Sequence, residues 1–258
     1  MVVTSAQLVH WVAQAGLPFL RVSMVFVTAP LFAGRLVPAR IRLALALVVT
    51  LVLVPVIPPP PAIDPLSPAG LLAVTHELLA GLVIGFILQL VFGAMVMGGH
   101  TIALGMGLGF ASMVDPQNGV QVPVVSQYYL VLATLLFLGM DGHLYLVQLL
   151  ADSFRYAPAG PATLDAESFH RLAAWGGRMF ADGLLIAIPA VTALLLTNIA
   201  FGVVTRAAPQ LNIFGVGFPV TLTLGFLLIL FTLPVIVPRF LRLLADGFDL
   251  IPLLLRGS

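Results

Sequence analysis

The 258-residue chain is 60% hydrophobic and only 8% charged, with a formal net charge of +1 and no cysteine. Its mean hydropathy is +1.14. Soluble domains carry roughly 25% charged residues because their surface must be hydrated, so this composition indicates an integral membrane protein. The near-neutral charge argues against nucleic-acid binding, and the absence of cysteine and lysine excludes disulfides, thiol catalysis and Schiff bases.

A helix that crosses the bilayer needs about 20 mostly apolar residues, and the chain offers about six such runs. In chain order they cover residues 8–32, 41–57, 69–98, 122–140, 168–204 (apolar from 183) and 218–237. The fourth run continues into an amphipathic stretch that ends near residue 154, and residues 155–168 form the most polar segment. The sequence therefore predicts an all-α, polytopic membrane protein of about six hydrophobic helices.

Two features interrupt this pattern. Residues 78–114 carry no charge and are too long for one straight span, so we expect a break at the Gly98-Gly99 pair, with further glycines at 105, 107 and 109. Residues 239–258 are expected to form a separate short amphipathic helix.

Catalytic and metal-binding motifs are incomplete throughout the sequence. The segment that begins His76-Glu77 resembles the start of the zinc motif H-E-x-x-H, but the second histidine is missing. The glycines at 105, 107 and 109 lack the spacing and the strand–helix context of a dinucleotide loop. We therefore expect no enzyme activity, no cofactor and no metal.

Arg21, Glu77 and Arg206 lie in apolar surroundings, where an ionisable group is costly unless it is paired or faces a cavity. One interpretation is a structural ion pair between Arg21 and Glu77. The other is a mid-membrane substrate site of a small-solute or ion transporter.

The segment from Gly105 to Gly119 combines helix-weakening glycines with turn residues. It is either a re-entrant turn between two spans or a mobile gate element that faces a pore. The candidate gate residues are Met106, Gly107, Gly109, Phe110, Met113, Asp115, Pro116, Gln117 and Asn118.

A connector separates the last two long apolar runs. Spacing alone predicts a helix terminus there, with a proline that stops the helix and side chains that satisfy free backbone groups. Its candidate residues are Arg206, Pro209, Gln210, Asn212, Phe214 and, slightly later, Pro219.

At this connector the chain resembles the FliR/SctT family of type III export-gate proteins. The block Arg206-Ala207-Ala208-Pro209-Gln210-Leu211-Asn212 is the most specific part of the likeness. It extends nearly end to end, through residues 217–219, 110–116 and 138–143, and Pro18, Arg21, Ala29, Pro30, Pro38 and Arg40.

The resemblance implies a non-enzymatic subunit of the flagellar export gate in the bacterial inner membrane, at the flagellar basal body. The implied partners are FliP, FliQ and FlhB-like subunits, unfolded flagellar proteins in transit, and membrane lipid. Residues 1–182 would resemble FliP and residues 183–258 a FliQ-like hairpin and tail. The pore plug of the family would correspond to about residues 107–122, and the connector would dock on neighbouring subunits. A virulence-type SctT subunit, which differs in its cargo, is an alternative.

Overall fold

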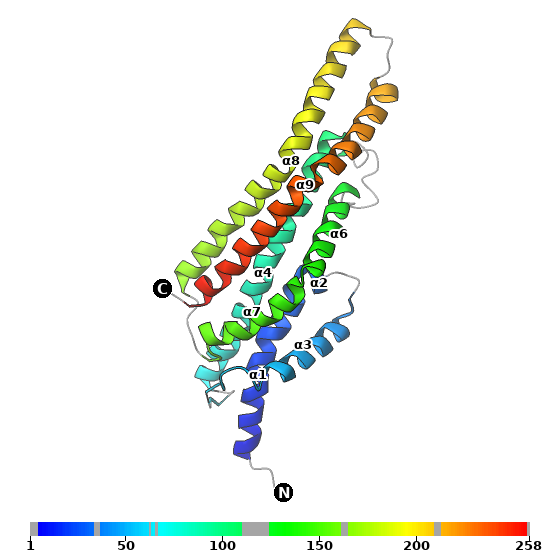
Figure 1. Ribbon diagram of the computed structural model, residues 1–258. Coiled ribbons are helices and arrows are strands. Elements are labelled where there is room, and N and C mark those ends of the chain that lie inside the picture. The colour runs from blue at the N-terminus through cyan, green and yellow to red at the C-terminus, as the bar shows by residue number, and fades with distance from the viewer. Residues whose placement is uncertain are drawn as a thin grey trace. The chain divides into compact units, whose positions relative to one another are not determined.

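The computed structural model describes residues 5–33, 37–61, 63–64, 67–109, 124–160, 165–208 and 213–256. These residues form helices joined by turns, and no strand occurs among them, so the all-α prediction is confirmed (Figure 1). The helices are α1 (Ser5–Thr28), α2 (Pro30–Ala33), α3 (Ala39–Leu53), α4 (Pro68–Gly105), α6 (Val124–Gly139), α7 (Gly142–Tyr156), α8 (Ala166–Ala207) and α9 (Ile213–Leu255).

Three of the described helices are long and apolar enough to cross a membrane: α4, α8 and the part of α9 from Gly217 to Leu255. The bent pair α6 and α7 provides a fourth span if both are counted together. Helix α3 has 15 residues and is about 22 Å long, shorter than the roughly 30 Å hydrocarbon core. The chain is thus a multi-pass membrane protein, and the prediction of about six hydrophobic spans is not confirmed.

The predicted break occurs at the later glycines, because α4 ends at Gly105 and Gly107 has a φ of 84°. The part of the prediction that placed a break at Gly98-Gly99 is wrong, because α4 continues through both glycines. The two glycines allow close helix packing instead. A Cβ atom on Gly98 would lie 3.1 Å from the carbonyl oxygen of Gly183 in α8, and one on Gly99 would lie 3.0 Å from the carbonyl oxygen of Val125 in α6. Small residues let helix backbones approach closely in a membrane, which explains why glycines occur inside a continuous helix.

The predicted separate helix over residues 239–258 is also wrong, because α9 runs without interruption to Leu255. Its buried residues recur every three or four positions, as expected for one helix with a single inward stripe. The stripe consists of Ile236, Phe240, Leu243, Leu244, Phe248, Ile251, Leu254 and Leu255. This stripe passes Pro238 without a change of register, so the helix continues where composition suggested a new element.

The chain divides into two compact units. The first, unit 1, contains Met1–Leu90, Phe137–Gly176 and Leu244–Ser258. In this unit, α3 packs on α1 through a narrow buried stripe of Ala46, Thr50 and Leu53. The Ser168 hydroxyl of α8 donates to the carbonyl of Leu254 in α9 at 2.9 Å, which joins the ends of these two helices.

The second, unit 2, contains Val91–Leu136 and Gly177–Leu243. Here α4 packs against α8 through small residues, since a Cβ on Gly183 would lie 2.9 Å from the Ala94 carbonyl oxygen. The rings of Phe92 and Phe240 meet edge to face, with centroids 5.8 Å apart. The core of this unit is therefore a close-packed helix bundle.

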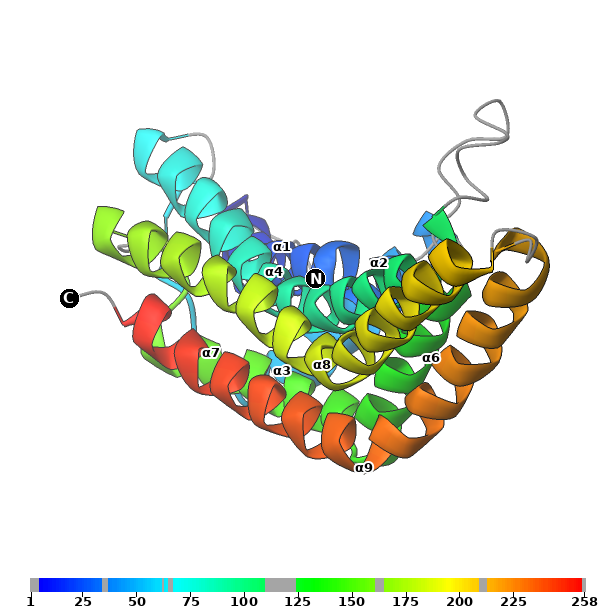
Figure 2. The ribbon, with the colours of Figure 1, turned by 90° about the horizontal axis from the view of Figure 1, so that it is seen from above.

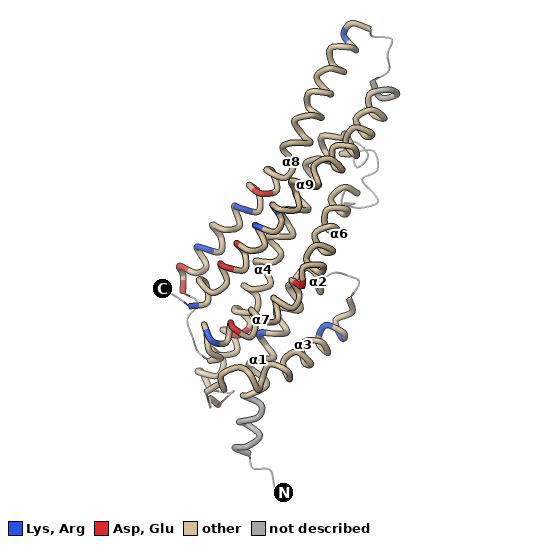
Figure 3. Tube along the Cα trace, in the orientation of Figure 1, with Lys and Arg blue, Asp and Glu red and all other residues tan. Residues whose placement is uncertain are grey.

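Helices α8 and α9 lie side by side as an antiparallel pair in both views (Figures 1 and 2). Apart from Arg206 in the last turn of α8, their charges lie in one half of the pair, as Figure 3 shows. Helix α8 has no charged residue between Asp182 and Arg206, and α9 has none before Arg239. The pair therefore has an uncharged half, residues 183–205 and 213–238, and a charged half at the opposite end, with Arg206 next to the connector.

Candidate functional site

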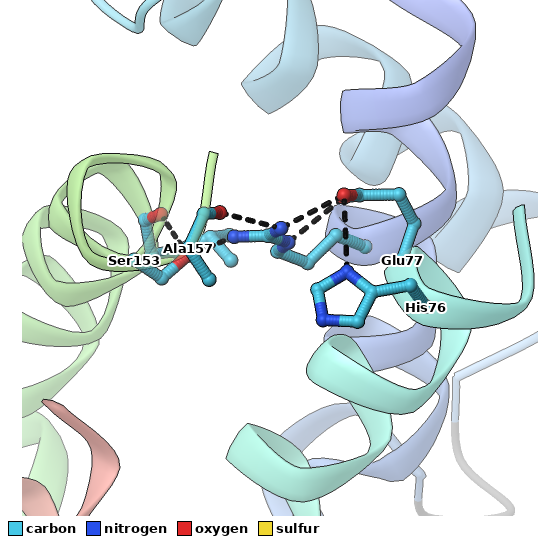
Figure 4. A network of polar contacts seen from close by, with 6 residues as sticks. His76, Glu77, Ser153 and Ala157 are labelled. Atoms are coloured by element: carbon cyan, nitrogen blue, oxygen red, sulfur yellow. Dashed lines mark hydrogen bonds and ion pairs between the residues drawn. The ribbon is translucent and has the colours of Figure 1, made fainter. Parts of the chain in front are cut away.

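An ion pair between Arg21 of α1 and Glu77 of α4 forms the polar centre of unit 1 (Figure 4). Arg21 Nε and Nη2 each donate to a different carboxylate oxygen of Glu77 at 2.8 Å. Both side chains have zero exposed fraction. Two parallel charge-assisted bonds are among the strongest polar contacts in proteins, so the structure brings these two residues together in a geometry that compensates much of the cost of burial.

Arg21 also binds the end of α7. Its Nη1 donates to the Ser153 hydroxyl at 3.1 Å, and its Nη2 donates to the carbonyl of Ala157 at 2.9 Å. The guanidinium lies 4.1 Å from the centroid of the Phe154 ring. A cation at a helix C-terminus is favourable because the last carbonyls carry partial negative charge. One side chain thus connects α1, α4 and α7.

Helix α4 approaches α1 beside this ion pair through two glycines four residues apart. A Cβ atom on Gly81 would overlap the carbonyl oxygen of Arg21, and one on Gly85 would overlap the side chain of Thr28. This is a small-xxx-small contact of the type that brings membrane helices together. The close approach sets the distance that the Arg21 and Glu77 side chains must span.

The ion-pair network is closed. His76 Nδ1 lies 3.8 Å from Glu77 Oε1 at its edge, and the guanidinium makes four hydrogen bonds to neighbouring groups. Groups of three or more His, Asp or Glu side chains suited to a metal ion are absent from the part of the chain that the structure describes. This geometry holds helices together and leaves no surface on either ion for a solute.

The second site is the C-terminal end of α4, where the predicted gate segment begins. The amide of Leu108 donates to the Ala103 carbonyl at 3.0 Å and the amide of Gly107 donates to the Leu104 carbonyl at 3.0 Å. Gly107 has a φ of 84°, in the left-handed region that favours glycine. This pair of bonds is a Schellman motif, which ends the helix at a defined residue.

The structure places only part of the predicted gate. Met106 is fully buried in unit 2, Gly107 ends the helix, and Gly109 follows it. The remaining candidates lie outside the described residues: Phe110, Met113, Asp115, Pro116, Gln117 and Asn118.

The connector is likewise described only at its two ends. Arg206 is exposed in the last turn of α8, Phe214 is in the first turn of α9, and Pro219 is exposed further along α9. Pro209, Gln210 and Asn212 lie outside the described residues.

Sequence reasoning missed several residues of these sites. Ser153, Phe154 and Ala157 bind Arg21 from more than 130 positions away in the chain. No local pattern in the sequence marks them. The Gly81 to Gly85 spacing was readable as a helix-packing motif, although only the structure shows that α1 is the helix packed on it.

Comparison with known proteins matches residues 12–247 to the family of bacterial export proteins, family 1. The chain belongs to this family. It is 40% identical over 248 residues to the flagellar biosynthetic protein FliR of Pectobacterium carotovorum, covering 96% of this chain and 94% of that protein. It is 39% identical to FliR of Escherichia coli, and this match covers 96% of this chain and 95% of that protein. FliR of Bacillus subtilis is 32% identical over 223 residues, covering 85% of this chain and 86% of that protein.

The match extends across both sites of this bacterial export protein. The family's region includes Arg21, Glu77, the end of α4 and the connector between α8 and α9. Likeness of this length covers the whole helical architecture rather than one motif.

We predict that removal of one partner of the ion pair destabilises this export-family protein strongly. Arg21→Met or Glu77→Leu alone leaves an uncompensated buried charge and is expected to cost about 3–5 kcal/mol, whereas the double substitution costs far less. Thermal unfolding of the purified protein in its complex measures the effect, with exposed Arg155→Met as the control. An equal loss of thermal stability in the single and double variants would contradict the argument that the two ions compensate each other.

We predict opposite effects for two glycine-to-alanine substitutions. Gly107→Ala should destabilise the end of α4 by about 1 kcal/mol or more, because alanine disfavours a positive φ. Gly177→Ala, in α8 where an added Cβ meets nothing within 4 Å, should stabilise by up to about 1 kcal/mol. Thermal unfolding compares the two variants, and the same sign for both would refute the assignment of Gly107 as a helix stop.

Proposed function

We propose that this protein is a subunit of the flagellar protein-export apparatus in the bacterial inner membrane, at the base of the flagellum. The observation that carries this proposal is the likeness to flagellar biosynthetic FliR proteins over 96% of the chain. Three or four membrane spans support the inner-membrane location. The flagellar names of the relatives favour flagellar cargo over virulence cargo.

Within that apparatus, we propose that the chain works as a structural and pore-gating subunit of a hetero-oligomer. Its partners would be FliP, FliQ and FlhB-like subunits, with residues 1–182 FliP-like and residues 183–258 FliQ-like. Large apolar side chains in the uncharged half of the hairpin support this, since Leu196 and Phe231 are 65% and 74% exposed. Exposed apolar surface of this extent requires lipid or protein to cover it.

The gate itself would be the segment from about residue 107 to 122, which blocks ions when the apparatus is idle and yields when an unfolded flagellar protein passes. Methionine side chains suit such a plug because they are flexible and polarizable. The defined helix stop at Gly107 supports this role, since it gives the segment a fixed starting point.

The connector would dock on neighbouring gate subunits. The exposure of Arg206 and Pro219 at its described ends supports contact with another molecule. Its Gln210 and Asn212 amides would satisfy backbone groups at the turn between α8 and α9.

A small-solute or ion transporter is the rival function, with Arg21 and Glu77 as its substrate site. The geometry of the pair weighs against it, because both ions are fully buried and bind each other through two hydrogen bonds. A substrate would have to displace those bonds.

Co-purification tests the assignment. Expressed together with the FliP and FliQ of the same bacterium, the chain should elute in one large, detergent-stable hetero-complex. Expressed alone, it should be poorly stable because its apolar surface is uncovered. The masses of the detergent-extracted particles give the result. A monodisperse particle of this chain alone that ignores added FliP and FliQ would favour the transporter.

Deletion of residues 112–120 tests the plug. The shortened segment should raise the ion permeability of the membrane while some protein export continues, because a passage that is normally blocked stays open. A potential-sensitive dye measures permeability in cells that express the assembled gate, and a wild-type gate is the control. Unchanged permeability with an assembled gate would contradict the plug.

A further inference from the structure

Helix α3 is apolar around most of its circumference, and the rest of unit 1 covers only a narrow part of it. Between Leu43 and Leu53 it contains only leucine, alanine and valine apart from Thr50, whose hydroxyl donates to the Ala46 carbonyl of the same helix at 2.7 Å. A helix that is apolar on all sides needs an apolar environment beyond its own chain. The large side chains on the sides that do not pack on α1 are 40–63% exposed: Ile41, Leu43, Leu45, Leu47, Val48, Leu51 and Val52.

The composition of this surface favours lipid over protein as the medium that covers it. Protein interfaces are enriched in aromatic residues, methionine and arginine, and they carry hydrogen-bonding groups. The exposed sides of α3 between Leu43 and Leu53 offer only aliphatic carbon. A surface without polar groups that select a partner protein is typical of a helix in the hydrocarbon core of a bilayer.

The first turn of α3 is positively charged and has no acidic counterpart. Arg40 is exposed and Arg42 is half-buried there, at the blue start of α3 in Figure 3. The chain has no acidic residue before Asp64, and among the described residues neither arginine forms an ion pair. By contrast, Arg155 and Arg171 lie 3.1 and 3.0 Å from carboxylates of their own helices. The charge of this turn is therefore not compensated within the described part of the chain.

Two features make an anion beside this turn favourable. Arg42 Nε is buried and has no hydrogen-bond acceptor among the described residues. The N-cap residue Pro38 forms no side-chain cap and the first turn holds no acidic residue, so both cations face the positive end of the helix dipole. An anionic acceptor would bind the guanidinium groups and offset this repulsion.

We propose that Arg40 and Arg42 bind the phosphate of an anionic bilayer phospholipid, whose acyl chains lie along the aliphatic sides of α3. Arginine suits this position because its stem lies along apolar surface while its guanidinium reaches the headgroups and binds phosphate through two parallel hydrogen bonds. The site lies wholly within unit 1. It does not depend on the export function proposed above.

The effect of lipid on thermal stability tests this inference. The protein, purified in its complex, is titrated with phosphatidylglycerol in micelles of a neutral detergent, and the unfolding temperature is measured. Phosphatidylglycerol should raise this temperature, whereas zwitterionic phosphatidylcholine should have little effect. Arg40→Gln and Arg42→Gln should each raise the phosphatidylglycerol concentration for half-maximal stabilisation about fivefold, the contribution of one basic residue near an anionic lipid surface.

Two matched substitutions serve as controls. Arg155→Gln and Arg171→Gln also remove an exposed arginine, but each of these arginines already has a carboxylate partner, so the titration should not change. Equal titrations of the wild type and the Arg40→Gln/Arg42→Gln variant would overturn the inference, as would an equal shift in the control variants. If the double variant does not fold, Arg40→Gln decides alone, because this side chain is exposed.

Two further measurements identify the source of the anion. Inorganic phosphate at the same concentration should not stabilise the protein, because it lacks acyl chains that cover α3. Equal stabilisation by inorganic phosphate would overturn the assignment to a lipid. Loss of a co-purified subunit from the Arg40→Gln/Arg42→Gln variant, with an unchanged response to phosphatidylglycerol, would also overturn it and assign this surface to a protein partner.

Discussion

Close approach of helix backbones is the constraint on which this structure depends. In lipid, apolar side chains gain little by leaving one apolar environment for another, so helices associate through packing of small residues and polar bonds between them. Gly81 and Gly85 bring α4 against α1, while Gly98 and Gly183 bring α4 against α8. The Arg21–Glu77 ion pair is possible because the first of these contacts places the two helices at the distance that both side chains span.

The two units use this constraint differently. Unit 1 adds a buried charged network to its glycine contacts, and that network reaches α7 through Ser153 and Ala157. Unit 2 relies on small residues and on bonds to the end of α4, where Asn198 and Thr221 provide the donors. Separating the two ions of unit 1 would leave uncompensated buried charges, whereas the donors that bind the end of α4 in unit 2 are neutral. The first unit is therefore joined by charged side chains and the second by neutral ones.

How far the sequence predicts this structure depends on how far apart in the chain the interacting residues lie. The all-α fold follows from apolar runs, and the Arg21 and Glu77 candidates follow from the cost of an isolated buried charge. The prediction of a break at Gly98-Gly99 was wrong. Glycine occurs both where a backbone bends and where two backbones pack closely, and the sequence of one helix does not show whether a neighbouring helix packs there. Asn198 and Thr221 lie 93 and 115 positions from the carbonyls that they bind, so no local pattern identifies them.

The length of the α8–α9 hairpin has a consequence for where the protein meets the bilayer. Helices of 42 and 43 residues are each about 65 Å long, roughly twice the thickness of the hydrocarbon core. A single bilayer therefore covers about half of each helix, and the half with most of the charged residues is the one less suited to lipid. Each of the two helices therefore extends beyond the hydrocarbon core, so its remaining length needs water or another protein around it.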